Sequence, residues 1–457
     1  MREFGHSELG HAARTKRLVR LASEMILSPA ASIPKSIVDP AQAKATYRFL
    51  SNPHVSSEGI LSGHVRATAD RCVLAGAVLA LQDTTTLTFH SRALADLGPV
   101  NDGEHTKGFL AHTTLAVSQE SHEVLGVLHQ HVWVRSREKK PKNETSAERK
   151  KRSRESEHWG DNQRHAAREI AEARERGSAA HPRVIAVFDR EGDIFEAMGV
   201  LDELGHSFVI RAGRNRLLED DGSGAPRYAL DEVRLAPVVA RKTVSVRARA
   251  GATGRNAEIE LRAIAARLLP PRSSDRRGDA LEVNIVLAEE IGAPPDAQPL
   301  CWYLVTREPI ETQEQALAIV RAYEARWIIE EFHMGLKTGC SCEDRQMESA
   351  HALQNFLAVA TPMACELLRL RDAARKVTPL SQCTMLTPTE MKVVKELRPR
   401  AMAKATTARH LMRIVANFGG FLNRNTDPDP GWRTLWRGFE AIKLTAIGYE
   451  LRDRARD

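Results

Sequence analysis

Residues 183–194 read RVIAVFDREGDI, and this stretch decides the predicted fold. A short, unbroken apolar run is typical of a strand buried on both faces, and here the run ends at Asp189. The stretch at 73–83, VLAGAVLALQD, has the same form and ends at Asp83. A carboxylate there is unfavourable unless it is hydrogen-bonded, paired or bound to a cation. The two strands therefore predict a pair of functional aspartates, although each could instead simply cap the turn after its strand.

The segments around these strands predict an α/β core with a mixed sheet. Two further strand candidates follow Asp83, at 108–117 and 124–134, and a helix and the short strand SFVIR at 207–211 follow Asp189. Strands that come first and then alternate with helices are typical of such a core. At about 212–308, alternating and apolar strands separated by Gly- and Pro-rich joints predict an inserted antiparallel β subdomain.

Both ends of the chain are predicted to be helical. Apolar residues recur at helical spacing from Arg14 to Leu27, and a second helix should begin near Pro40. We therefore divide the chain into a helical region at 1–70, an α/β region at 71–350 and a helical region at 351–457.

Composition limits the class of protein. The chain has 457 residues, of which 42% are apolar and 27% charged, as expected for a globular protein. The N-terminal sequence has no apolar core for a signal peptide, and no apolar run reaches the ~20 residues of a membrane-spanning helix. We therefore expect a cytoplasmic protein without membrane contact. The six cysteines do not predict a disulfide scaffold, and the close pair Cys340 and Cys342 is interpreted as small buried residues.

The net charge of +7 is concentrated in one segment. Between Arg135 and Arg154, ten basic and three acidic residues give the whole excess of +7. Such a run can be a nucleic-acid patch or a solvated loop, and its composition alone favours neither.

A further polar group lies on the helix predicted after the β insertion. This helix should start at a capping box formed by Thr312 and Gln315 and continue to about Lys337. At ~100° per residue, four of its residues share one face: Tyr323, Arg326, Glu330 and Lys337. A solvated face with intrahelical salt bridges is the alternative interpretation of this stripe.

Two aspartates and a glutamate that converge would suit a pair of divalent cations, because Mg²⁺ and Mn²⁺ prefer oxygen ligands. Two such cations ~4 Å apart can activate an attacking oxygen and stabilise a leaving oxygen at phosphorus. Tyrosine, arginine and lysine side chains on the same helix would then hold nucleic-acid phosphates. The residues thus predict metal-dependent phosphoryl transfer.

The segments ALQDTTTLTF, AVFDREGDI and YEARWIIEEFHMGLKTG resemble the DDE transposases of the bacterial insertion-sequence family four, whose helix signature is Tyr-x2-Arg-x3-Glu-x6-Lys. The resemblance extends to RTKRLVRLA near the N-terminus and to FGGFLNRNTDPDPGWRTLWRGFEAI near the C-terminus. It implies a ribonuclease-H-like core between a DNA-end-binding domain and a dimerisation region. The implied activity is cleavage of inverted-repeat ends by a homodimer, through a hairpin, and joining of the 3′-hydroxyl ends to target DNA.

The resemblance also implies roles for individual residues. It implies a metal-binding catalytic triad with two cations, Mg²⁺ or Mn²⁺: Asp83, Asp189 and Glu330. It implies contacts to double-stranded DNA by Tyr323, Arg326, Lys337, Arg211, Trp302, Arg14 and Arg17. Supporting roles fall to Arg190, Glu191 and Asp193, and the apolar residues of the dimerisation region would include Leu435, Trp436 and Phe439.

Alternatives remain open at the level of residues and of function. Trp302, which the resemblance implies stacks on a flipped base, could be plain strand core, and Arg14 and Arg17 could lie on a solvated helix face. A catalytically idle DNA-binding regulator is a second functional hypothesis. A glycosidase with two carboxylates is a third, but its sugar platforms would require more than the 5% aromatic residues present.

Overall fold

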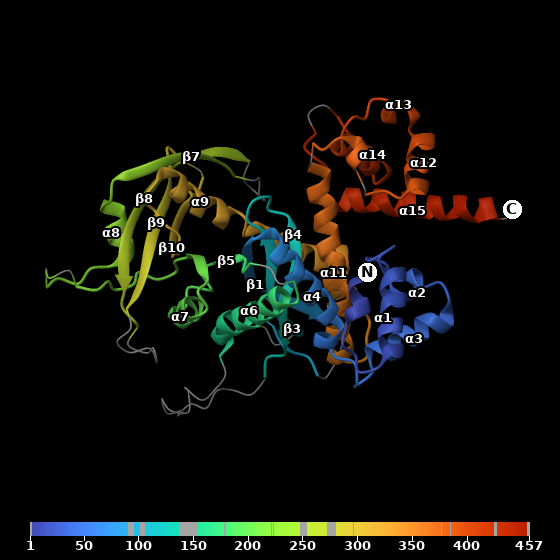
Figure 1. Ribbon diagram of the computed structural model, residues 1–457, viewed down its shortest axis with the longest axis horizontal. Coiled ribbons are helices and arrows are strands. Elements are labelled where there is room, and N and C mark those ends of the chain that lie inside the picture. The colour runs from blue at the N-terminus through green and yellow to red at the C-terminus, as the bar shows by residue number, and fades with distance from the viewer. Residues whose placement is uncertain are drawn as a thin grey trace.

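The computed structural model describes residues 2–89, 96–100, 106–136, 154–177, 180–220, 222, 224–246, 254–271, 280–295, 297–375, 377–383, 385–424 and 427–454. A mixed ten-stranded sheet runs through the molecule, with helices packed on it and helical regions at both ends of the chain (Figure 1). This arrangement confirms the predicted fold class, an α/β core of ribonuclease-H-like type.

The strands pair in the order β2-β3-β1-β5-β6-β10-β9-β8-β7, and β4 pairs with β3. Their bounds are β1 (Ala77–Phe89), β2 (Gly98–Pro99), β3 (Lys107–Ser118), β4 (Val124–Trp133), β5 (Arg183–Phe188), β6 (Ser207–Arg211), β7 (Val238–Val246), β8 (Arg255–Leu268), β9 (Leu281–Ile291) and β10 (Cys301–Thr306). The central pairs β1–β5 and β5–β6 are parallel, and the pairs outside them are antiparallel.

The helices of the N-terminal and core regions are α1 (Ala12–Met25), α2 (Ile33–Ser36), α3 (Pro40–Leu50), α4 (Ser57–Ala75), α6 (His158–Gly177), α7 (Phe195–Glu203), α8 (Ala229–Leu235), α9 (Gln313–Glu324) and α10 (Trp327–Met334). The helices that follow are α11 (Ala350–Arg375), α12 (Pro388–Leu397), α13 (Pro399–Met402), α14 (Ala408–Phe418) and α15 (Trp432–Arg454). The described helices include none that is both long and apolar enough to cross a membrane.

The first core strand differs from its prediction at both ends. The apolar residues from Val73 belong to the last turn of α4, which ends where Gly76 adopts a left-handed backbone with φ of 71°. Strand β1 then continues past Asp83 to Phe89, because the segment TTTLTF pairs residue by residue with β3. Asp83 therefore lies inside a strand, whereas Asp189 directly follows the end of β5 as predicted.

The predicted long helix is divided into two. The capping box of Thr312 and Gln315 is present, but α9 ends at Glu324, α10 follows, and a π-helical turn occupies Gly335–Gly339. Helix α9 packs against β5, β6, β7 and β9, whereas α10 packs against β1 and α11. Because the sheet twists from strand to strand, one straight helix would not follow both surfaces.

The β insertion continues the core sheet. Strand β10 pairs antiparallel with β6, with Leu304 opposite Arg211, and β9, β8 and β7 add to its other edge. The insertion and the core therefore form one continuous hydrogen-bonded sheet. Residues of β10 lie near α9 and α10.

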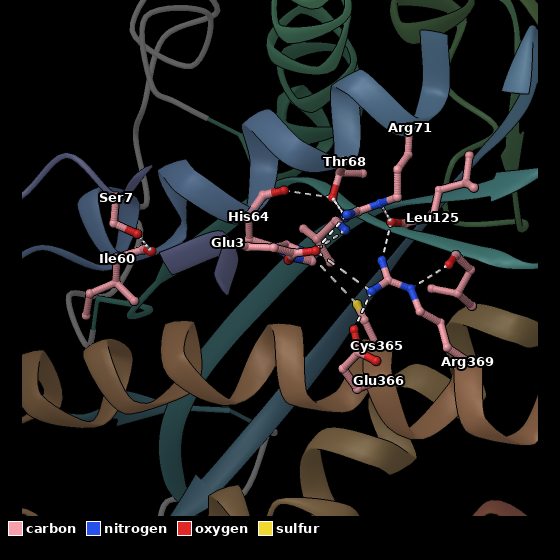
Figure 2. A network of polar contacts seen from close by, with 12 residues as sticks. Glu3, Ser7, Ile60, His64, Thr68, Arg71, Leu125, Cys365, Glu366 and Arg369 are labelled. Atoms are coloured by element: carbon pink, nitrogen blue, oxygen red, sulfur yellow. Dashed lines mark hydrogen bonds and ion pairs between the residues drawn. The ribbon is translucent and has the colours of Figure 1, made fainter. Parts of the chain in front are cut away.

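A buried polar network attaches the N-terminal segment to the core (Figure 2). Glu3, in the 3-10 helix Arg2–His6, accepts hydrogen bonds from Arg71 of α4 at 2.6 Å and from His64 at 2.5 Å. The Val127 N–H donates to His64 Nε2 at 3.0 Å, so the imidazole proton is on Nδ1 and faces Glu3. Arg369 of α11 reaches the same carboxylate at 3.9 Å, so the network joins α4, β4 and α11.

Helix α11 connects the two helical regions. The helices α1–α3 lie beside one end of α11, and the C-terminal helices gather at its other end (Figure 1). The break predicted at FGGFLNRNTDPDPGW lies between α14 and α15, which pack against each other.

Candidate active site

The two predicted aspartates meet at the centre of the sheet. Strand β1 runs parallel to β5 with Leu81 opposite Val187, so Asp83 and Asp189 lie side by side two residues further on. Burial, then the negative charge of Asp189 and, as a smaller effect, that of Glu330 raise the pKa of Asp83 to about 7. The fold therefore places Asp189 and Glu330 near enough to Asp83 for their charges to act on it.

Glu330 lies on α10, which packs against β1. Its Oε1 accepts a hydrogen bond from Arg326 Nη2 at 2.6 Å, and the guanidinium lies 5.9 Å from the ring centroid of Tyr323. The same guanidinium lowers the pKa of Asp83, against the larger effects that raise it. Arg326 therefore provides positive charge to a site that otherwise holds three acidic side chains.

The donor set suits divalent cations, although the side chains are not gathered around one point. Among the described residues, no group of three or more His, Cys, Asp or Glu side chains is close enough to hold one ion. Glu330 is directed to Arg326 instead. The raised pKa of Asp83 reflects an excess of negative charge, which a cation would relieve. The residues fit a metal pair if Glu330 exchanges Arg326 for a cation.

Tyr323 and Trp302 form an aromatic pair beside this cluster. Tyr323 is 4% exposed, and its ring stands edge-to-face to Trp302 with centroids 5.3 Å apart. Trp302, on β10, is only partly buried. Arg211 ends β6, where its Nη2 donates to the Cys301 carbonyl at 3.2 Å. Its buried Nε has no hydrogen-bond partner within the described structure.

Lys337 lies apart from the ion pair of Arg326, on the π-helical turn after α10. Its Nζ is 3.9 Å from Oε1 of Glu343. That oxygen also accepts hydrogen bonds from the N–H and the hydroxyl of Thr88, each at 2.8 Å. Lys337 is therefore held near the end of β1, past Asp83.

The supporting residues after Asp189 differ in their burial and in their hydrogen bonds. Asp189 Oδ1 accepts a hydrogen bond from the Glu191 N–H at 2.8 Å, while the side chains of Arg190 and Glu191 are exposed. Asp193 is buried and pairs with Arg216 at 2.5 Å. It also accepts from the N–H groups of residues 213 and 214 at 2.8 and 2.9 Å, and so fixes the loop after Arg211.

The other face of β1 is fixed by a buried hydrogen-bond chain. Its members come from β1, β3, α6 and the residue before β6, in the order Thr84, His112, Gln82, Gln163 and His206, at separations of 2.8 to 3.0 Å. Each member can donate to the next, if both histidines are neutral and protonated on Nε2. Since side chains alternate along a strand, this chain and Asp83 lie on opposite faces of β1.

Arg14 and Arg17 lie in the N-terminal helical region, both half-buried. Arg14 Nη1 donates to the Leu9 carbonyl at 2.9 Å, and Arg17 Nη1 donates to the Gln42 side chain. Neither has a contact with the three carboxylates within the described structure. Of the basic run, residues 137–153 lie outside the described residues, and Arg135 pairs with Glu155 at 2.6 Å.

The structure also places the remaining residues selected from the sequence. Cys340 and Cys342 are buried free thiols, as expected. Leu435 and Phe439 are 0% and 2% exposed and pack against α14 and α12 in the C-terminal core. Trp436 is also buried. The exposed apolar residues of α15 form a different stripe: Leu444, Ile447 and Leu451.

The sequence analysis also missed His333, one turn after Glu330 on α10. Its Nδ1 is 3.6 Å from Asp83 Oδ2. The spacing Glu-x-x-His places both side chains on one helix face, and this is the sequence signal that could have identified it.

Comparison with protein families matches two separate segments of the chain. Residues 1–55 match a family described as transposase DNA-binding, and residues 363–453 match the transposase Tn5 dimerisation domain. The two matches indicate a transposase that binds DNA. They support a transposase of the Tn5 type, with a homodimer and DNA as its partners.

Proposed function

We propose that this protein is a DDE transposase of insertion-sequence family four, which cuts inverted-repeat ends and joins them to target DNA. The observation that supports the proposal is that Asp189 and Glu330 lie near enough to Asp83 for their charges to raise its pKa, in a chain whose ends match DNA-binding and dimerisation domains. A glycosidase would leave both matches unexplained.

In the proposed reaction, a water oxygen forms a bond to the phosphorus at the transposon end, and the bond from phosphorus to the 3′ oxygen breaks. That oxygen takes up a proton as the water loses one, which leaves a 3′-hydroxyl. This hydroxyl would attack a phosphorus of the opposite strand, forming the hairpin and breaking the bond from that phosphorus to the 3′ oxygen of the flanking DNA. Water would reopen the hairpin, and the freed 3′-hydroxyl would attack a target phosphorus and displace the 3′ oxygen of the target strand. Two cations, Mg²⁺ or Mn²⁺, held by Asp83, Asp189 and Glu330 would supply the positive charge that favours attack and departure.

The proposed phosphate contacts depend on Glu330 exchanging its partner Arg326 for a cation. When Glu330 turns from Arg326 toward a cation, the guanidinium is released to donate to a DNA phosphate. Tyr323 at the end of α9 and Lys337 on the π-helical turn after α10 would add further phosphate contacts. The partly buried Trp302 beside Tyr323 offers a face for an unstacked base. Arg14 and Arg17 would contact the end in the N-terminal domain.

Cleavage of labelled end DNA tests the proposal. Separate alanine substitutions of Asp83, Asp189 and Glu330 should each abolish cleavage in Mg²⁺ while end binding persists. Glu314→Ala, an exposed carboxylate change on α9, is the matched control and should cleave normally. Cleavage by the Asp83→Ala protein would contradict the triad, and binding without cleavage by the unmodified protein would favour the idle regulator.

A further inference from the structure

His333 occupies an unusual position for a buried polar side chain. It is 7% exposed on α10, and its Nδ1 lies 3.6 Å from Asp83 Oδ2. Its other ring nitrogen, Nε2, is buried and has no hydrogen-bond partner within the described structure. An unpaired buried polar atom is unfavourable, so the position of this imidazole requires an explanation other than stability.

The proton on the imidazole can be assigned from the contacts. Nδ1 is the ring nitrogen that faces the Asp83 carboxylate, whereas Nε2 is buried on the other side of the ring without a partner in the described structure. With that proton on Nδ1, an N–H faces the Asp83 carboxylate. With it on Nε2, a nitrogen lone pair would oppose the carboxylate oxygen, which is unfavourable. The Nδ1–H form is therefore the one that the geometry favours.

Asp83 thus has a hydrogen-bond donor at one carboxylate oxygen and the imidazole at the other. The Thr84 N–H donates to Oδ1 at 2.9 Å, and His333 Nδ1 faces Oδ2. Each oxygen keeps a further lone pair, because a carboxylate oxygen accepts two hydrogen bonds or ligands. An imidazole N–H at this position would orient the carboxylate and leave those lone pairs for a ligand.

We propose that His333 is a positioning residue for Asp83, whose Nδ1–H orients the carboxylate for a divalent cation. The inference rests on the proposed function, in which Asp83 is a metal ligand. Contacts of this kind are often long without substrate, and the 3.6 Å separation would shorten as the carboxylate turns. Donors behind metal-ligating carboxylates typically contribute about 10- to 100-fold to metal affinity.

The test measures Mn²⁺ binding to the full chain without DNA, from the electron paramagnetic resonance signal of free Mn²⁺. His333→Leu removes the donor and should raise the dissociation constant by about 10- to 100-fold. His333→Asn keeps an N–H at similar reach, so its constant should stay close to that of the unmodified protein. His410→Leu alters a histidine of α14, outside the carboxylate cluster and its supporting hydrogen bonds, and should not change Mn²⁺ binding.

The outcomes separate this inference from the proposed function. Unchanged Mn²⁺ binding in His333→Leu, with binding lost in Asp83→Ala, would overturn the role of His333 alone. Equal losses in His333→Leu and His333→Asn would also overturn it, because the asparagine keeps the donor. Unchanged Mn²⁺ binding in Asp83→Ala would instead contradict the metal role of Asp83 in the proposed function.

Discussion

At the scale of single residues, Arg326 has two competing partners. In the structure it donates to Glu330 at 2.6 Å and lowers the pKa of Asp83. In the proposed reaction it would instead bind phosphate, and Glu330 would bind a cation. In the structure the Arg326 guanidinium therefore offsets part of the repulsion among the neighbouring carboxylates.

This competition gives a prediction for Arg326→Gln. The substitution removes the guanidinium that pairs with Glu330 and one positive charge near the cation site. Mn²⁺ should therefore bind about two- to fivefold more tightly in the absence of DNA. This factor corresponds to the free energy of a partly exposed ion pair. End cleavage should fall, because the phosphate contact is lost. The Mn²⁺ titration with the unmodified protein as reference checks the first part, and weaker Mn²⁺ binding would contradict it.

Some of these residues could be predicted from the sequence, and others could not. Asp189 was predicted because its signal is local, an apolar strand that ends in an aspartate. The contact of His333 with Asp83 joins a helix to a strand 250 residues earlier, and no local pattern records such a distance. Leu435 and Phe439 were expected among the apolar residues of the dimerisation region, but the sequence does not show that α12 and α14 cover them.

At the scale of elements, strand β1 is held from both faces. Asp83 faces α10, while Gln82 and Thr84 join the hydrogen-bond chain that reaches α6. In this chain His112 accepts from Thr84 and donates to Gln82, which requires a neutral ring. Burial, with neighbouring imidazoles such as His158 adding to the effect, lowers the pKa of His112 to about 3.

The neutral state of His112 predicts a pH dependence of stability. The unfolded chain takes up a proton near pH 6.5, whereas the folded chain does so near 3. The stabilisation is therefore fully present above pH 6.5 and is lost as the pH falls toward 3. At ~1.4 kcal/mol per pH unit, the folded state should lose about 2 kcal/mol between about pH 6.5 and about pH 5 from this residue.

Urea unfolding of His112→Gln measures this contribution. Glutamine can accept from Thr84 and donate to Gln82, so stability near neutral pH should change little, while the loss on acidification should shrink by about 2 kcal/mol. His410→Gln, at an exposed histidine, serves as the control and should keep the full pH dependence. An undiminished loss in His112→Gln would show that other groups account for the acid sensitivity.

The elements themselves were predictable to different degrees. The capping box at Thr312 and the apolar run before Asp189 gave correct starts and ends, because both signals are local. The division between α9 and α10 was not predicted, since Ala325 and Arg326 are good helix formers and the break follows from packing on a twisted sheet. The continuation of β1 past Asp83 depends on pairing with β3.

At the scale of the whole molecule, α15 carries the surface best suited to a second copy. Leu444, Ile447 and Leu451 are 58%, 41% and 60% exposed and lie on one helix face. They fall within the segment that matches the Tn5 dimerisation domain. Exposed apolar residues grouped in this way are typical of an interaction surface.

Replacing Leu444 and Leu451 with glutamate should therefore weaken dimerisation by about tenfold or more, because two charges would be buried in the interface. Sedimentation velocity of the protein with end DNA measures the paired complex, and binding of one end by one chain should persist. Glu450→Gln, at an exposed position on another face of α15, is the control. A paired complex of unchanged stability in the double variant would place the dimer contact elsewhere.

The attachment of Glu3 to Arg71 and Arg369 also bears on how the chain is made. A ribosome that adds ~5–20 residues per second needs about 20–70 s to proceed from Glu3 to Arg369. During that interval the N-terminal helices can form, but Glu3 lacks one of its partners and the surface that buries it is incomplete. The contacts of Glu3 with His64 and Arg71 can therefore form well before its ion pair with Arg369, which is completed late in synthesis.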